Sequence, residues 1–164
     1  SQWEDYCSQR EILGKRPDPE NWRAGRSILV AESNLQADEY LAKKEGGFRH
    51  YFHYLRTLES KRNMMDATLE ERETFVKSKV NEALEDQVIA GDADTVLQKL
   101  VAYREEVGPF GTLLMTGHDW DDKELWRRSM RMLAQDVMPR LSQHADATDN
   151  RFGNPIKERG RAPG

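Results

Sequence analysis

The residues with the clearest capacity for chemistry lie together in the segment 116–122. This segment reads Thr116-Gly117-His118-Asp119-Trp120-Asp121-Asp122 and so combines an imidazole, an indole and several carboxylates. His118 can offer a hydrogen bond or a proton near neutral pH. Trp120 can form one wall of an apolar pocket. The segment is therefore the first candidate for a binding site.

The carboxylates of this segment have two competing explanations. With His118 they could hold a metal ion, since imidazole and carboxylate are common metal ligands. However, Asp121 and Asp122 directly precede a predicted helix, and Asp121-x-x-Glu124 has the spacing of a capping box. Acidic side chains are also favoured there by the helix dipole. We therefore expect both aspartates to cap the helix, and we predict no metal site.

Two elements flank the segment and would position it. Residues 110–117 read as a short, buried strand bounded by glycines, and residues 123–141 read as an amphipathic helix. The expected buried face of that helix consists of Trp126, Met130, Leu133, Val137 and Leu141. A strand that leads into a helix through a polar turn is the repeating unit of α/β folds, whose active sites lie in such turns.

The rest of the chain alternates between expected helices and strands. The consecutive apolar residues within 26–32 predict a strand covered on both faces, and 87–91 is a weaker strand candidate. Further helices are expected near 3–13, 33–44, 48–62, 68–84 and 92–107, with capping boxes at Ser33-x-x-Gln36 and Thr68-x-x-Glu71. This alternation predicts a helix-rich α/β fold with a parallel sheet and right-handed crossovers. Two or three strands cannot close a barrel.

Several side chains are expected in the core. For the 48–62 and 68–84 helices these are Phe48, Tyr51, Phe52, Leu55, Leu58, Leu69, Val76, Val80 and Leu84. Cys7 shares a helical face with Trp3 and Tyr6, so we expect a buried structural thiol rather than a nucleophile. His50 and His53 have a spacing that could hold a metal, but no third ligand accompanies them.

Composition excludes several functional classes. The chain has 164 residues, of which 33% are charged, and a net charge of −4, so it offers no electrostatic attraction to nucleic acid or to anionic membranes. No apolar run approaches the roughly 18 residues that span a bilayer, and we see no signal segment. The single cysteine cannot form an internal disulfide, which fits a cytoplasmic location.

Several segments resemble one known family. Residues 107–114 (VGPFGTLL), 116–122 (TGHDWDD) and 137–141 (VMPRL) look like the C-terminal end of a luciferase-like, FMN-dependent monooxygenase of the limonene-monooxygenase-like branch. Residues 22–32 and 88–96 resemble further segments of that family, with Ala93 in place of the usual proline. The similarity runs from about Trp3 to Leu141.

The resemblance implies a (β/α)8 TIM barrel that uses reduced FMN and O2, with the flavin supplied by a separate NAD(P)H-dependent reductase. All the similar segments belong to the C-terminal half of that barrel. Residues 1–141 would then be a partial barrel and residues 142–164 an irregular tail. The N-terminal strands, which supply most flavin contacts in the family, have no counterpart. The chain could be a fragment, one subunit of a split barrel that pairs with a partner subunit, or a remnant with another role.

The resemblance also implies a site. Thr116, Gly117, His118, Asp119 and Trp120 would lie at the barrel mouth beside a small, largely apolar organic substrate, into which one oxygen atom of O2 is inserted. The resemblance identifies no catalytic residue.

Gly91 precedes a helix whose N–H groups could bind an FMN phosphate. Asp92 and Asp94 place negative charge at the same position, where they would serve as caps. By itself the chain is expected to be inactive and to bind no FMN tightly. The alternative is a non-catalytic α/β interaction subunit that pairs with a partner through its incomplete sheet.

Overall fold

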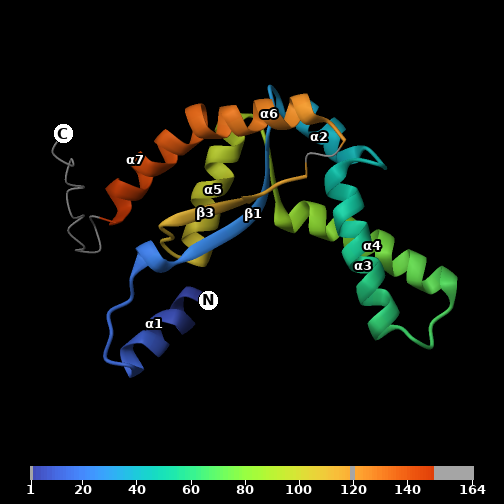
Figure 1. The fold of residues 1–164 in the computed structure, drawn as a ribbon, viewed down its shortest axis with the longest axis horizontal. Helices are drawn as coiled ribbons and strands as arrows, with labels where there is room; N and C mark the ends of the chain where they lie inside the picture. Colours follow the sequence, from blue (N-terminus) through green and yellow to red (C-terminus); the bar gives the residue numbers. More distant parts are fainter. Residues whose placement is uncertain (1, 119–120, 150–164) are drawn as a thin grey trace.

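The structure is a computed structural model that describes residues 2–118 and 121–149 (Figure 1). Its centre is a parallel sheet of three strands in the order β2-β1-β3. The strands are β1 (Arg23–Val30), β2 (Val88–Gly91) and β3 (Thr112–Thr116). The expectation of a helix-rich α/β fold with a parallel sheet is confirmed, including the weak strand candidate at 87–91.

The two neighbouring strands pair with different parts of the central strand β1. Residues 23–27 pair with β3, whereas residues 27–30 pair with β2 on the opposite edge. Ser27 is the residue at which both pairings meet. Along 27–30 every side chain is buried, as predicted for a strand with helices on both faces, but Arg23 and Gly25 are exposed.

Strand β3 is less buried than the sequence predicts. Leu114 is 53% exposed, and Thr116 is exposed as well. β3 is an edge strand, and Leu114 pairs with the exposed Gly25 on a sheet face that no described element covers there. The prediction of a buried strand at 110–117 is therefore wrong, because one face of β3 is open.

Seven α-helices surround the sheet in the described part of the chain. They are α1 (Gln2–Ile12), α2 (Asn34–Ala42), α3 (Gly47–Asn63), α4 (Leu69–Gln87), α5 (Ala93–Val107), α6 (Lys123–Met132) and α7 (Met138–Asp149), and a short 3₁₀ helix spans Pro19–Asn21. The Thr68 and Glu71 capping box is confirmed in full. At α2, Ser33 accepts from the Gln36 N–H as predicted, but the Gln36 side chain accepts from Glu32 instead of Ser33.

The sheet separates two apolar cores. Leu29 of β1 belongs to a core formed with α2, α3, α4 and the start of α6. The neighbouring Ile28 points to the other face, where α5, α6 and α7 pack. The alternation of adjacent residues between the two cores explains why this part of β1 is a continuous apolar run.

The predicted helix over 123–141 is interrupted and also extends further. A π-helical turn (Leu133–Val137) separates α6 from α7, and the Met138 N–H donates to the Leu133 carbonyl five residues back. Pro139 lacks an N–H to continue the α-helical pattern, which accounts for the irregular turn before it. α7 continues to Asp149, so the prediction of an irregular tail from residue 142 is wrong as far as residue 149. Residues 150–164 lie outside the described residues.

The buried face predicted for the 123–141 helix is correct except at Met130. Met130 is largely exposed, whereas its neighbour Ser129 is fully buried. The Ser129 hydroxyl accepts a hydrogen bond of 2.8 Å from the backbone N–H of Val30. A polar side chain therefore takes the place against β1 where the sequence suggested a methionine.

α3 and α4 form a hairpin that extends away from the sheet (Figure 1). Phe48 and Phe52, near the start of α3, are buried as predicted, but Leu55 and Leu58 are exposed. Leu69, at the start of α4, is 73% exposed. The predictions for these three leucines are wrong, because the outer half of the hairpin lies beyond the reach of the sheet.

α1 contacts the rest of the chain through aromatic rings. The rings of Trp3 and Tyr6 lie 5.6 and 5.1 Å from that of Trp22. Cys7 is only half-buried, so the prediction of a buried thiol is wrong. Burial first, and then the charges of Glu11 and Glu4, raise the pKa of the Cys7 thiol, which therefore stays protonated near neutral pH. None of the described helices is both long and apolar enough to cross a membrane.

Candidate functional site

His118, which follows β3, is enclosed by two elements, β1 and α3. Its side chain is 1% exposed. Nε2 lies 3.0 Å from the Ser27 hydroxyl of β1. The rings of Phe48 and Tyr51 of α3 lie 4.5 and 4.8 Å from the imidazole. His118 is therefore held between the sheet and the first turns of α3.

Burial determines the charge of this imidazole. Desolvation lowers the pKa of His118, and the negative charge of Asp121 acts in the opposite direction with a smaller effect. His118 is therefore neutral near neutral pH. A neutral imidazole carries one donor and one acceptor nitrogen, so it can orient a polar group by hydrogen bonding.

Asp121 connects the turn after β3 to α2 and α3. The Tyr40 hydroxyl of α2 donates a hydrogen bond of 2.6 Å to Asp121 Oδ1. The backbone N–H of Gly47, at the start of α3, faces the same tyrosine oxygen and acts to lower the Tyr40 pKa with a smaller effect. Burial, followed by the hydrogen bond to Asp121, raises the pKa of Tyr40 well above its usual value, so Tyr40 remains a donor.

The helix cap differs from the prediction in one residue. Asp122 is the N-cap of α6, and its Oδ1 accepts from the Leu125 N–H at 2.9 Å. The expected capping box between Asp121 and Glu124 is wrong, because Asp121 turns back toward Tyr40 and Glu124 pairs with Arg127. The two aspartates thus have separate roles, one at the helix and one in the site.

Gly47 allows α3 to approach the turn closely. A Cβ at this position would lie 2.8 Å from the His118 carbonyl oxygen and 3.0 Å from Asp121 Oδ1. Such distances are shorter than van der Waals contact, so any side chain would push α3 away from His118. The glycine pair at 46–47 looked only like a helix breaker in the sequence.

The structure brings together part of the predicted site. Thr116 and Gly117 are exposed at the end of β3, and His118 follows them into the interior. Asp119 and Trp120 lie outside the described residues. The sequence did not indicate Ser27, Tyr40, Gly47 or Tyr51 as site residues, and Tyr51 was expected only in the core. These residues lie on β1, α2 and α3, far from His118 in the sequence.

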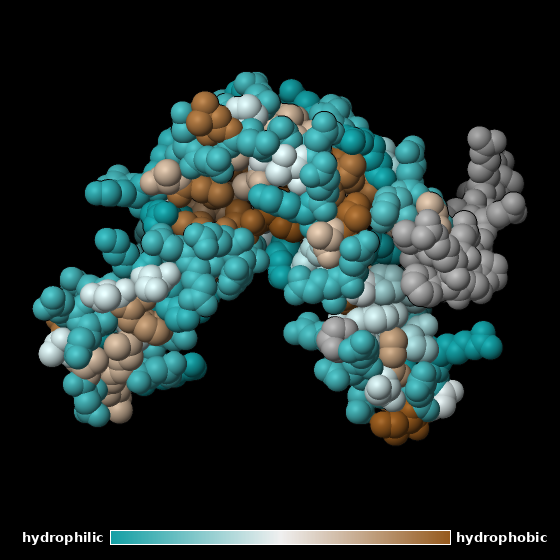
Figure 2. Space-filling model, turned by 180° about the vertical axis from the view of Figure 1, so that it is seen from behind, coloured by the Kyte–Doolittle hydropathy of each residue, from teal (hydrophilic) through white to brown (hydrophobic). Residues whose placement is uncertain are grey.

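An open sheet face adjoins this site. Ser27, which holds His118, pairs with Thr116, and the next pair on the same face of the sheet, two residues toward the amino ends of the strands, is Gly25 with Leu114. Gly25, Leu114 and Thr116 are all exposed. Figure 2 shows hydrophobic surface on the concave side of the molecule, between the two projecting parts. The side of the site away from α3 is therefore accessible and partly apolar.

At Gly91, the predicted phosphate position, nearby backbone N–H groups already donate to protein oxygens. The Asp92 N–H donates to Asn34 Oδ1 at 2.9 Å, and the Thr95 N–H donates to Asp92 Oδ1 at 2.8 Å. A Cβ at Gly91 would lie 2.7 Å from Asn34 Oδ1. These contacts favour the capping explanation, and cofactor binding by Gly91 stays a prediction.

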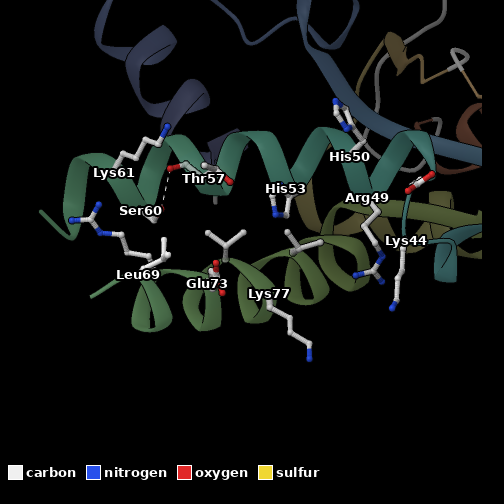
Figure 3. A pocket seen from close by; sticks show the side chains of 14 residues that line it. Lys44, Arg49, His50, His53, Thr57, Ser60, Lys61, Leu69, Glu73 and Lys77 are labelled. Carbon is white, nitrogen blue, oxygen red and sulfur yellow. Dashed lines mark hydrogen bonds between the residues drawn. The ribbon is translucent and has the colours of Figure 1, made fainter. Parts of the chain in front are cut away.

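The described residues hold no group of three or more metal-ligating side chains. The imidazole of His53 points from α3 toward α4, whereas that of His50 points away from α4 (Figure 3). The two rings thus point in different directions.

Comparisons with known proteins identify relatives. No protein-family model matches the chain. It is 27% identical over 158 residues to 4-hydroxyprotoasukamycin monooxygenase of Streptomyces nodosus subsp. asukaensis, which covers 93% of this chain and 39% of the relative. It is 28% identical over 142 residues to 3,6-diketocamphane 1,6-monooxygenase of Pseudomonas putida, covering 85% of this chain and 37% of the relative.

A solved structure agrees with these relatives. The fold matches the oxygenating constituent of 3,6-diketocamphane monooxygenase from Pseudomonas putida, a type II Baeyer–Villiger monooxygenase in complex with FMN, with a TM-score of 0.65 and 26% identity. The match covers 84% of this chain and 38% of that chain. This chain thus spans about two fifths of the length of these relatives, and it is similar in sequence and fold to flavin-dependent monooxygenases.

Proposed function

We propose that this chain is part of a two-component, FMN-dependent monooxygenase that inserts one oxygen atom of O2 into a small, largely apolar organic substrate. The observation that carries the proposal is the agreement of sequence and structure comparisons, which match most of this chain to monooxygenases, one of them bound to FMN. In the proposed enzyme a separate NAD(P)H-dependent reductase supplies reduced FMN.

The chain would contribute one wall of the substrate site. In barrels of parallel strands the active site lies at the carboxyl ends of the strands. Thr116, Gly117 and His118 follow the carboxyl end of β3, and we place the substrate beside them, together with Asp119 and Trp120. The imidazole of His118 is held by Ser27 and is 1% exposed here, so it would orient a polar atom of the substrate only where binding uncovers it.

The hydrogen bonds at the start of α5 weigh against an FMN phosphate at Gly91. At the start of α5, the only helix start for which the sequence suggests a phosphate site, the N–H groups of Asp92 and Thr95 are bonded to protein oxygens, and the Asp92 carboxylate adds negative charge. Bound FMN supplies the activation of O2 in such enzymes. We derive no step through the flavin from this chain and assign most flavin contacts to the remainder of a longer protein, which would also cover the open face at Gly25 and Leu114.

The first experiment measures the composition of the native protein. Native mass spectrometry with a denaturing gel would show whether the 19.0 kDa sequence occurs in a longer polypeptide or with a second one. Purified with that additional part and given reduced FMN and O2, the protein should form an absorbing flavin–oxygen adduct. Failure of the completed protein to form the adduct would refute the proposal.

Flavin binding by the 164-residue chain provides a separate test. We expect no tight binding, because the phosphate contacts are missing. Quenching of FMN fluorescence with micromolar affinity would contradict this expectation.

A second candidate is a non-catalytic interaction subunit. It is supported by the open face of β3, where Leu114 is 53% exposed in an edge strand. In that case the protein should bind a partner stably but yield no flavin–oxygen adduct when complete. Leu114→Thr should weaken the association, as measured by analytical ultracentrifugation, and a monomer at all concentrations would exclude this candidate.

A further inference from the structure

The α3–α4 hairpin contains a groove that the proposed function does not use. Its volume is about 710 Å³, within the range of roughly 300–1,000 Å³ of small-molecule sites. Figure 3 shows the groove between the two helices, and neither His118 nor any strand residue lines it. The groove is therefore separate from the site at the end of β3.

The two helices present different surfaces to this groove. Arg49, His53 and Thr57 of α3 are spaced four residues apart, so they form a polar stripe along one face. α4 contributes an apolar stripe that includes Leu69 and Val80. Val76 and Val80 are buried between the helices, whereas Leu69 is 73% exposed, so the accessible apolar surface of α4 in the groove lies at the Leu69 end.

The lining carries an excess of positive charge. The ionised lining residues are Lys44, Arg49, Lys61, Arg72, Lys77, Glu45 and Glu73. Five positive and two negative side chains give 5 − 2 = +3 with neutral histidines, although the whole chain carries −4. A positive groove in an acidic protein attracts small anions.

Arg49 provides a specific anchor at one end. Its Nη1 donates to Asn81 Oδ1 of α4 at 3.0 Å, which fixes the guanidinium across the hairpin. Its Nε is buried and has no acceptor among the described residues. A buried donor without an acceptor is costly, and a guanidinium matches the geometry of carboxylate and phosphate. Lys44 lies at the same end of the groove (Figure 3).

We propose that the α3–α4 groove binds an elongated organic anion. Its carboxylate or phosphate contacts Arg49 and Lys44, and its aliphatic chain runs between the two helices from the level of Val80 toward the exposed Leu69. Eleven residues of helix separate these two apolar side chains, a length of about 16 Å, which suits an aliphatic chain of medium length. The inference does not rest on the proposed monooxygenase function.

Isothermal titration calorimetry at low ionic strength tests the ligand class. The chain is titrated with decanoate, decyl phosphate, decanol and decylamine, all below their aggregation concentrations. We expect decanoate or decyl phosphate to bind and the neutral and cationic compounds to bind at least about fivefold more weakly. Preference for decanoate or for decyl phosphate identifies the head group, and either preference supports the proposal.

Matched variants test the position. Lys44→Gln should weaken binding of the preferred anion about fivefold. Lys43→Gln, which removes the same charge one residue away and outside the groove, should leave the affinity within about twofold of the unchanged chain. Leu69→Gln should weaken binding of the decyl chain, whereas Met65→Gln, an equally exposed position outside the groove, should not.

These substitutions are at exposed positions, so circular dichroism should show unchanged folding. The proposal is overturned if neither anion binds at millimolar concentration, or if decanol and decylamine bind as tightly as the anions. It is also overturned if Lys43→Gln weakens binding as much as Lys44→Gln does.

Discussion

The His118 imidazole and the Ser27 hydroxyl lie 3.0 Å apart, although 91 positions separate them in the sequence. Ser27 is the residue of β1 at which the pairings with β2 and β3 meet, so it belongs to the best-anchored part of the sheet. His118 is thereby fixed to a rigid element, although it follows a strand whose own face is open. A neutral, oriented imidazole is the contribution that this chain can make to a binding site.

Removal of this hydrogen bond should destabilise the chain. In Ser27→Ala the buried His118 nitrogen loses its partner, so the free energy of unfolding should fall by about 1–3 kcal/mol. Urea unfolding followed by circular dichroism measures the change. Ser78→Ala, at an exposed position in α4, is the matched control and should not lower stability. Equal stability of the two variants would show that the bond to His118 contributes nothing.

Stability should depend on pH through His118. Its pKa is lowered in the folded chain by burial, so below its ordinary value of 6.5 the unfolded chain binds more protons than the folded one. The free energy of unfolding should therefore fall as pH falls below about 6.5 and level off once the folded pKa is passed.

The variant His118→Phe separates the contribution of His118 to this pH dependence from that of the carboxylates. In the variant the free energy of unfolding should change less steeply between pH 7.5 and pH 5.5. Identical slopes in the two proteins would contradict a buried, neutral His118.

The Tyr40 hydroxyl should be needed to hold the turn after β3. Tyr40→Phe leaves Asp121 Oδ1 without the tyrosine donor, so we expect a loss of about 1–2 kcal/mol. Tyr54→Phe, on the exposed side of α3, is the matched control and should have no effect. In the Tyr40 variant the NMR signals of His118 should also shift, and unchanged signals would mean that Tyr40 does not act on the site.

A side chain at Gly47 should displace α3. In Gly47→Ala the new methyl group would lie 2.8 Å from the His118 carbonyl oxygen, so the variant should lose about 1–3 kcal/mol of stability. Gly25→Ala, where the nearest atom would be 3.9 Å away, should be tolerated much better. The melting temperatures of the two variants provide the comparison, and equal losses would contradict the close approach of α3 to His118.

The sequence predicted the local features that depend on nearby residues. The capping box of Thr68 and Glu71, the buried run 27–30 and the helices around them follow from spacing and side-chain type. His118 was singled out as a candidate site residue because a polar turn follows an apolar strand, and its place beside a substrate stays a prediction.

Features that depend on tertiary neighbours were not predicted. Nothing near Leu114 in the sequence indicates that its sheet face is open, and nothing near Asp121 indicates that Tyr40 would compete with the helix cap for its carboxylate. The same holds for Leu69, which has the spacing of a core residue but lies in a hairpin beyond the sheet. In each case burial or hydrogen bonding depends on which described residues, distant in the sequence, lie nearby in the fold.

The shared pairing of β1 also has a consequence for the order of folding. Its partners lie 88 − 27 = 61 and 112 − 23 = 89 positions further along the chain. Contacts over such separations form slowly, because a long loop must close before any of them is gained. During synthesis β1, the strand with the most buried residues, therefore emerges long before either neighbour exists. Of the three strands, β1 therefore exposes its apolar run at 28–31 for the longest time, and we expect chaperones to bind the nascent chain there.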